Sequence, residues 1–175
     1  GNVVGTFQVL EGCRVHPVRH LLFASTSSAY GGNRAVPFRE TDRAVWPLTI
    51  YAASKIAGEA MAHSYAHLWK IPTTAFRFFT VYGPWGRPDM AAYIFTRQIE
   101  AGQPIKVFNH GKMRRDFTYI DDIVQGVLAA LARPPQDGGK DAPPVALYNL
   151  GNSKAEDLLR FIAVLESALG KQAVL

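Results

Sequence analysis

The chain has 175 residues, 48% hydrophobic and 19% charged, a composition that can bury a core and excludes disordered, collagen-like and disulfide-scaffold proteins. No run approaches the roughly 18 apolar residues of a membrane span, no basic-then-apolar leader opens the sequence, and the single Cys13 fits a reducing cytoplasm. The net charge of +5 permits an anionic partner, but the basic residues are scattered apart from 112–115, which favours a local phosphate site over a nucleic-acid surface.

The first half of the sequence predicts two helices and two strands around a long loop. Apolar residues at helical spacing predict a helix over 2–13, and small residues at every fourth position predict a closely packing helix over 51–69. The apolar run 20–25 predicts a buried strand, although its periodicity alone leaves a short helix open. The β-branched and aromatic run 73–79 predicts a second strand, and glycine and proline predict a loop over 31–49.

The second half continues the alternation of helices and strands. Glycine and proline predict a loop over 83–88, and Asp89 is expected to cap a helix that runs to about residue 101. The remaining predicted elements, in chain order, are strands 105–108 and 117–120, a helix 121–133, a turn-rich loop 134–144, a strand 145–150 and a helix 155–169. This alternation indicates an α/β fold with a parallel sheet.

Tyr51 and Lys55 form a Tyr-x-x-x-Lys pair on the predicted helix 51–69. Residues four apart share one helix face, so the Lys55 ammonium can lie near the Tyr51 phenol. A neighbouring cation favours the phenolate, which makes a general base from a tyrosine. The pair alone is common by chance, and an ordinary core tyrosine beside a solvated lysine is the simpler interpretation of it.

A cluster of hydroxyl side chains favours the catalytic interpretation of the Tyr51–Lys55 pair. The residues 25–28 (Ser-Thr-Ser-Ser) follow the predicted strand 20–25 at its carboxyl end, where open α/β sheets bind ligands. A hydroxyl there can bond the same substrate oxygen that Tyr51 deprotonates. Elsewhere, His63 and His67 share a helix face but have no third ligand, so we expect no metal site.

Six parts of the sequence carry a family likeness. They are Asn2 with Gly5-Thr6, STSSAYG (25–31), YAASK (51–55), RFFTVYGPWGRPDMA (77–91), RRDFTYIDDIV (114–124) and YNLG (148–151). Together they resemble the extended short-chain dehydrogenase/reductases that act on nucleotide sugars, and within that family they are most similar to the UDP-glucuronate 4-epimerases. The likeness spans nearly the whole chain. It implies the C-terminal half of a Rossmann-like doubly wound parallel sheet plus part of a small substrate-binding region.

The resemblance implies a reaction at C4 of a UDP-uronic acid. In the family, hydride passes from C4 to bound NAD, the resulting 4-keto sugar turns over, and hydride returns to its opposite face. The substrate would be UDP-glucuronate and the product UDP-galacturonate. Partners other than the UDP-sugar and a second copy, namely nucleic acid or a membrane, are not expected.

The family's site residues carry over as implications. Tyr51 would be the general base on the 4-hydroxyl, Thr26 would share the 4-oxygen, and Lys55 would hold the nicotinamide ribose. Phe79 would lie with Tyr51 and Lys55 at the cofactor. The remaining substrate contacts would come from Ser27, Ser28 and Thr80 at the uronate carboxylate, Arg115 at the diphosphate and Arg87 at the nucleotide, where a surface loop arginine is the equally open alternative.

Two positions separate sibling activities within the family. In the 4,6-dehydratases acids stand at the positions of Ser27 and Ser28, and in the decarboxylases a glutamate stands at that of Ser28. Both are serines in this sequence, which disfavours these reactions. Another nucleotide-sugar epimerase or dehydratase of the family stays open as an alternative.

The family's glycine-rich dinucleotide turn does not occur in the 175 residues. We therefore expect an internal fragment that lacks this N-terminal unit and is inactive alone. Because the resemblance stops after the helix that ends near residue 170, we expect the C-terminal end to be missing as well. Within the fragment, residues 1–82 are expected to be the second half of the dinucleotide-binding domain with the catalytic Thr, Tyr and Lys. Residues 83–175 are expected to be mostly substrate-binding region, with 116–150 contributing elements back to the main sheet.

An incomplete sheet exposes strand edges and apolar helix faces. We therefore expect self-association, and intact members of the family commonly form a homodimer through the helices that correspond to 2–13 and 51–69. A non-catalytic, self-associating fragment is the second hypothesis for what this chain is.

Overall fold

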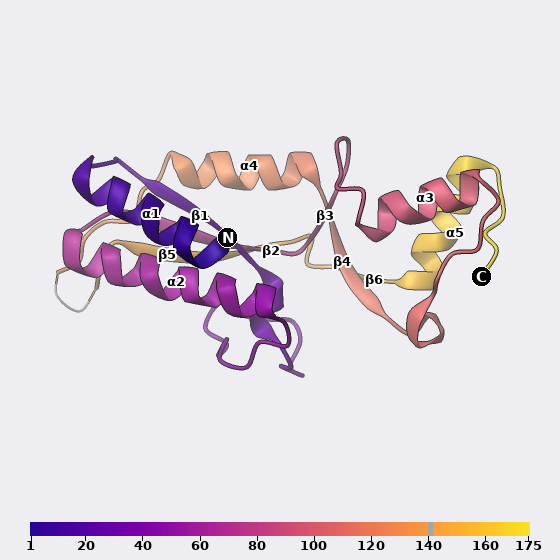
Figure 1. Cartoon of the computed structure of the whole chain (residues 1–175), viewed down its shortest axis with the longest axis horizontal. Helices are drawn as coiled ribbons and strands as arrows, with labels where there is room; N and C mark the ends of the chain where they lie inside the picture. The colour runs from indigo at the N-terminus through magenta and orange to yellow at the C-terminus, as the bar shows by residue number, and fades with distance from the viewer. Residues whose placement is uncertain (140–141) are drawn as a thin grey trace. The chain divides into compact units, whose positions relative to one another are not determined.

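The computed structural model describes residues 1–139 and 142–175, which divide into two compact units (Figure 1). The first unit is Gly1–Phe79 with Val124–Leu150, and the second is Thr80–Ile123 with Gly151–Leu175. The loop predicted over 134–144 is irregular where it is described, and its residues 140 and 141 lie outside the described residues.

A parallel sheet forms the centre of the first unit. Its strands are β1 (Leu21–Thr26), β2 (Thr73–Phe78) and β5 (Val145–Leu150), in the order β1-β2-β5. The register aligns all three from first residue to last, so their carboxyl ends lie along one edge of the sheet. The predicted α/β fold with a parallel sheet is confirmed, and each of these strands matches its prediction to within one residue.

Helices cover the sheet on both sides. Figure 1 shows α1 (Asn2–Val15) and α2 (Ile50–Trp69) on one side and α4 (Ile120–Leu131) on the other. The α2 helix starts where it does because the Thr49 side chain accepts a hydrogen bond from the Ala52 N–H at 3.1 Å, as an N-cap does. Between α1 and α2 lies a core of Leu10, Ala62, Tyr65 and Ile71.

Gly58 lets α2 approach the sheet. A Cβ at this position would collide with the ring of Phe23 on β1. We therefore expect Gly58→Val to lower the free energy of unfolding by about 1–3 kcal/mol, because the ring must be displaced. In α1, no atom lies within 4 Å of a Cβ added at Gly5. Gly5→Val should leave stability unchanged to within about 0.5 kcal/mol. Equal effects of the two variants in urea unfolding would contradict the close approach.

The carboxylate of Glu11 links α1 to α2. It accepts a hydrogen bond from the Tyr65 hydroxyl at 2.5 Å and pairs with Arg14 at 2.9 Å. The hydrogen bonds from Arg14, and secondly that from Tyr65, hold the pKa of Glu11 below its usual range.

A carboxyl with a lowered pKa in the folded state stabilises that state above its unfolded pKa, and this contribution is lost as the pH falls through the folded pKa. Between about pH 7 and about pH 3 the melting temperature should therefore fall more steeply for the unsubstituted protein than for Glu11→Gln, which takes up no proton at this position. Parallel curves for the two proteins would show that Glu11 does not stabilise the fold.

The second unit has its own sheet and core. Strand β4 (Arg114–Tyr119) pairs in parallel with β3 (Thr80–Tyr82) and antiparallel with β6 (Ala155–Asp157). Helices α3 (Ala91–Glu100) and α5 (Leu158–Leu169) enclose a core of Phe95, Ile99, Ile105, Leu158 and Ile162.

Several predicted elements of this unit were wrong. Residues 105–108 form no strand: the run is apolar because Ile105 is buried in the core, and its N–H reaches only the Val174 carbonyl, at 2.8 Å. Asp89 does not cap α3, because its carboxylate is occupied by Arg87 and the helix begins after Met90. The last helix begins at Leu158 rather than 155, since 155–157 pair with β4 instead.

Candidate active site

The carboxyl end of β1 turns directly into a short helix. Thr26 is the last residue of the strand and caps the 3-10 helix η1 (Ser27–Tyr30), its hydroxyl oxygen accepting a hydrogen bond from the Ser28 N–H at 3.2 Å. Ser27 and Ser28 are therefore consecutive residues of that turn. Helix α2 contacts both β1 and η1. The three hydroxyl residues thus lie at the sheet edge where parallel sheets bind ligands.

Tyr51 and Lys55 occupy one face at the start of α2. The Lys55 ammonium donates a hydrogen bond to the Ala24 carbonyl oxygen at 3.0 Å and lies 5.9 Å from the centroid of the Tyr51 ring. Tyr51 is 47% exposed, and no hydrogen bond joins its hydroxyl to any other described residue. The cation is thus held at the end of β1, and the phenol beside it is accessible.

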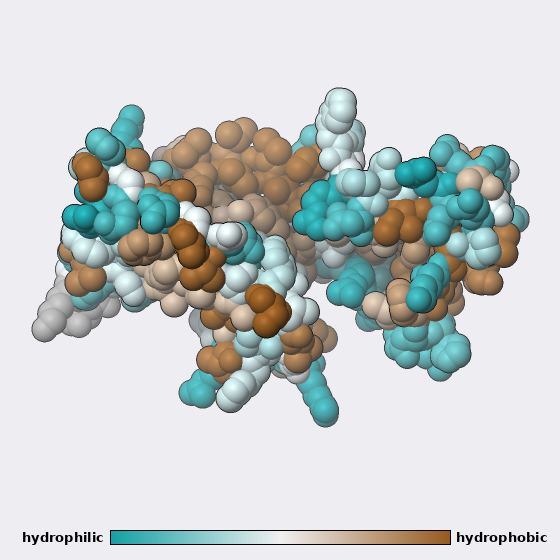
Figure 2. Space-filling view, in the orientation of Figure 1, coloured by the Kyte–Doolittle hydropathy of each residue, from teal (hydrophilic) through white to brown (hydrophobic). Residues whose placement is uncertain are grey.

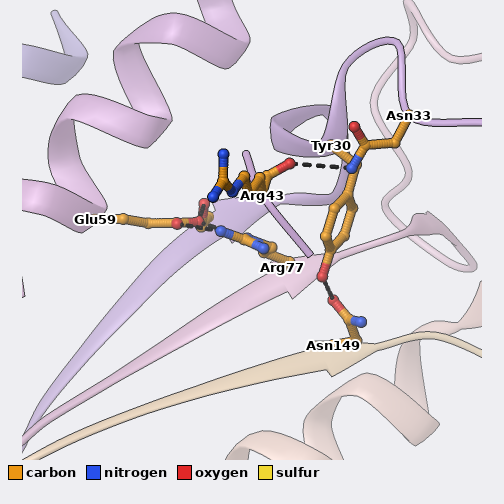
Figure 3. Close-up of polar contacts among 7 residues, drawn as sticks. Tyr30, Asn33, Arg43, Glu59, Arg77 and Asn149 are labelled. Atoms are coloured by element: carbon orange, nitrogen blue, oxygen red, sulfur yellow. Dashed lines mark hydrogen bonds and ion pairs between the residues drawn. The ribbon is translucent and has the colours of Figure 1, made fainter. Parts of the chain in front are cut away.

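Beneath this surface lies a buried ion pair (Figure 3). Arg77 on β2 is only 4% exposed, and its guanidinium donates to both carboxylate oxygens of Glu59 on α2, at 3.0 and 2.7 Å. Burial is the largest single influence on Arg77 and disfavours its charge, but the hydrogen bonds and charge interactions with Glu59 and Tyr30 together outweigh it, so the pKa of Arg77 is raised. The Ser25 hydroxyl donates to the same carboxylate. Ser25 is therefore committed to Glu59, unlike its neighbours in the hydroxyl cluster.

The network continues through Tyr30 to β5. The Tyr30 ring lies 4.7 Å from the Arg77 guanidinium carbon and 4.6 Å from the ring of Phe38, and its hydroxyl donates to the Asn149 side-chain oxygen at 2.6 Å (Figure 3). The Asn149 amide in turn donates to the Phe38 carbonyl at 3.1 Å. The ring of Phe79, the residue after β2, lies 6.5 Å from that of Phe38. This network ties η1 and the loop after it to the sheet.

Sequence reasoning missed Glu59, Arg77, Tyr30 and Asn149. One signal was available: Arg77 is the one charged residue of the strand predicted over 73–79, and a buried charge needs a partner. A second was the position of Glu59, four residues after Lys55 on the same helix face. Neither signal identifies the partner, because the two residues belong to different elements.

Three of the predicted substrate-binding residues belong to the second unit. Thr80 begins β3, Arg115 lies on β4 opposite Glu156 of β6, and Arg87 lies in the loop after β3. Arg87 pairs with Asp89 through two hydrogen bonds, at 3.0 and 2.6 Å. Both arginines are exposed. Within the first unit, the predicted neighbours Tyr51 and Lys55 do lie side by side. Thr26 and Tyr51 are not joined by a hydrogen bond in the described part of the chain.

Neither a metal site nor a membrane-spanning helix is found among the described residues. No group of three or more His, Cys, Asp or Glu side chains gathers as a metal site among residues 1–139 and 142–175. Over the same residues, none of the helices combines the length and apolar character needed to cross a bilayer.

Comparison with known proteins places the chain in a family. Residues 1–151 match the NAD dependent epimerase/dehydratase family, and the chain therefore belongs to that family. It is 46% identical over 184 residues to the probable UDP-glucuronate 4-epimerase of Rhizobium meliloti strain 1021, covering 99% of this chain and 54% of that protein. With UDP-glucuronate 4-epimerase 4 of Arabidopsis thaliana it shares 46% identity over 181 residues, covering 98% of this chain and 41% of that protein.

A solved structure gives the same likeness in three dimensions. The crystal structure of UDP-glucuronic acid 4-epimerase from Bacillus cereus, in complex with UDP-glucuronic acid and NAD, superposes with a TM-score of 0.86 at 35% identity. The match covers 99% of this chain and 53% of that one. The chain thus spans about half the length of the relatives that it matches.

Proposed function

We propose that the protein is an NAD-dependent epimerase that inverts C4 of a UDP-uronic acid and converts UDP-glucuronate to UDP-galacturonate through a 4-keto intermediate. The observation that carries this function is the accessible Tyr51 phenol with the Lys55 ammonium beside it, hydrogen-bonded to Ala24, two residues before Thr26 ends β1. Support for the substrate comes from relatives named UDP-glucuronate 4-epimerases at 46% identity.

Tyr51 is proposed to transfer the proton of the sugar's 4-hydroxyl, and Thr26 to hydrogen-bond the 4-oxygen. Tyr51 removes that proton as general base and returns it after the sugar has turned over, while the Thr26 hydroxyl bonds the same oxygen. The neighbouring Lys55 cation favours the phenolate form that this role needs. The exposure of the Tyr51 ring supports its access to substrate.

The donors present suit a dinucleotide. A lysine ammonium carries three N–H donors, and one of those of Lys55 is used on the Ala24 carbonyl, which leaves two for the hydroxyls of a nicotinamide ribose. Tyr51 and Phe79 are the other residues proposed to contact the cofactor. The chemistry that NAD supplies when bound is reversible oxidation at C4 of the sugar.

The remaining proposed contacts hold the substrate's negative charges. Ser27, Ser28 and Thr80 donate hydroxyl hydrogen bonds to the uronate carboxylate, which an acidic side chain there would repel. Retaining that carboxylate also opposes its loss as carbon dioxide from the β-keto acid. Arg115 binds the diphosphate and Arg87 assists at the nucleotide, since a fixed guanidinium matches phosphate oxygens.

The two units are proposed to divide these tasks. The first, with Thr26, Tyr51 and Lys55, serves the cofactor and the chemistry, and the second, with Arg115, serves the substrate. The 175 residues hold no glycine-rich dinucleotide turn, so we propose that this chain is inactive by itself. The half-buried free Cys13 supports a reducing cytoplasm as the compartment.

The test is conversion of UDP-glucuronate by the full-length protein with NAD, followed by nuclear magnetic resonance of the sugar. UDP-galacturonate is the expected product, and the 175-residue chain assayed beside it should form none. Release of carbon dioxide or of a dehydrated sugar by the full-length protein would assign it to a sibling activity instead. No reaction at all would remove the epimerase function.

We also propose that the protein self-associates through α1 and α2. Large apolar side chains lie exposed on these helices, among them Val4 at 66% and Leu68 at 63%, and Figure 2 shows a further apolar area over α4. Exposed apolar surface of this kind marks contact sites. In sedimentation at micromolar concentration we expect a dimer or larger species, and a smaller one for the Val4→Glu/Leu68→Glu variant. A strictly monomeric unsubstituted protein would rule the association out.

A further inference from the structure

One buried ion pair holds both ends of the segment 25–30, in which the hydroxyl groups of Thr26, Ser27 and Ser28 are proposed to face the sugar (Figure 3). At the start of this segment the Ser25 hydroxyl donates to the Glu59 carboxylate. At its end the Tyr30 ring lies 4.7 Å from the guanidinium carbon of Arg77. Glu59 and Arg77 are joined at 3.0 and 2.7 Å, so the two ends are tied through a single pair of side chains.

The same pair reaches the helix that carries the general base. Glu59 follows Lys55 by four residues and Tyr51 by eight on α2, so all three share one face of that helix. Arg77 lies on the central strand of the sheet, β2. The carboxylate therefore connects the turn after β1, the strand β2 and the face of α2 that bears Tyr51.

Stability alone does not account for charges in this position. Burying an ion pair removes both charges from water, and well-packed apolar residues of similar volume often serve folding equally well. What the pair adds is orientation: the guanidinium bonds both carboxylate oxygens while its carbon lies over the Tyr30 ring, 4.7 Å from the centroid. A lysine ammonium is a point charge on a flexible stem and does not offer the fixed fork that matches both carboxylate oxygens.

We propose that Glu59 and Arg77 are positioning residues that fix the Thr26–Ser28 hydroxyls relative to Tyr51 and Lys55, a role that rests on the proposed epimerase function. The pair touches neither sugar nor cofactor and acts through Ser25 and Tyr30. Small displacements of reacting groups cost much rate. Weakening the Glu59–Arg77 pair should therefore lower kcat more than it weakens substrate binding.

The experiment uses Arg77→Lys in the full-length protein, which keeps the charge but loses the bidentate hydrogen bonds to Glu59. We expect kcat for UDP-glucuronate to fall about 10- to 100-fold with KM nearly unchanged. Amide hydrogen exchange over residues 26–31 should become faster at the same time. Should this variant fail to fold, Ser25→Ala answers the same question, because it removes one hydroxyl and leaves the ion pair in place.

A matched control separates positioning from loss of stability. Ile71 is buried in the core between α1 and α2, before the amino end of β2 and so at the opposite edge of the sheet from Thr26. Ile71→Val and Ile71→Ala are both made, and the control is whichever of them lowers the melting temperature by the same amount as Arg77→Lys. This control should have the kcat of the unsubstituted protein and the same amide hydrogen exchange over residues 26–31.

Two results would overturn the positioning role. The first is exchange over 26–31 that rises no more in Arg77→Lys than in the Ile71 control. The second is faster exchange with kcat at the control value, which would show that order in this segment does not serve the reaction. If the unsubstituted protein itself does not epimerise, the proposed function fails separately, and the exchange measurement alone then decides whether the pair orders the segment.

Discussion

Tyr51→Phe is expected to lower kcat for epimerisation by about 10²- to 10⁴-fold in the full-length protein, because it removes the group that takes the proton from the 4-hydroxyl. This corresponds to about 2.7–5.4 kcal/mol of transition-state stabilisation. The fold should persist, since no described residue bonds the Tyr51 hydroxyl and the side chain is half exposed. Steady-state kinetics with circular dichroism measures both quantities.

The control for this variant is Tyr93→Phe. Tyr93 lies on α3 in the second unit and is 41% exposed, close to the exposure of Tyr51. Its loss of a hydroxyl should leave kcat unchanged. A Tyr51→Phe protein as active as the Tyr93→Phe protein would withdraw the general-base role from Tyr51.

Glu59→Ala is expected to lower the free energy of unfolding by about 3–5 kcal/mol, because it leaves the buried Arg77 guanidinium without its counter-charge. The Glu59 side chain is 14% exposed and that of Arg77 5%, so water cannot replace the lost partner. Urea unfolding of the variant beside the unsubstituted protein measures the difference.

An exposed ion pair in the same unit provides the comparison. Lys70 and Asp137 pair at 3.2 Å, with about two fifths of each side chain exposed. Asp137→Ala should produce no measurable loss, as is usual for pairs that water screens. If Glu59→Ala lowered the free energy of unfolding as little as Asp137→Ala, the Glu59–Arg77 pair would be screened by water and could not hold the Thr26–Ser28 segment in place.

The elements that the sequence predicted well are those whose pattern is local. Apolar and β-branched runs located β1, β2 and β5 to within one residue, and the four-residue spacing of Tyr51 and Lys55 placed them on one face of α2. In each case the pattern consists of residues within one strand or helix. The element can therefore be predicted without knowing which distant residues it contacts.

The failures come from contacts between distant parts of the chain. The run at 105–108 is apolar because α3 and α5 bury Ile105, and hydrophobicity alone does not separate that from a strand. Residues 155–157 leave the predicted helix because β4 offers them a partner. The short strand β3 was missed because the chain leaves the first sheet at Phe79, whose N–H still bonds the Leu150 carbonyl at 3.0 Å.

The site was predicted in the same uneven way. The four hydroxyls at 25–28 looked equivalent in sequence, yet Ser25 is bound to Glu59 while the Thr26 hydroxyl caps η1. The ion pair itself joins residues 18 positions apart on a helix and a strand. The family motifs predicted functional roles for Tyr51, Lys55 and Thr26, and the folded chain revealed the contacts around these residues.

The most direct test of the proposed epimerase uses UDP-glucuronate that carries deuterium at C4, with the full-length protein and NAD. Oxidation and reduction at C4 within one site predict UDP-galacturonate that retains the deuterium at C4 and keeps its carboxylate. Loss of the deuterium to water, or release of carbon dioxide in place of the epimer, would contradict a C4 epimerase built on Tyr51, Lys55 and Thr26.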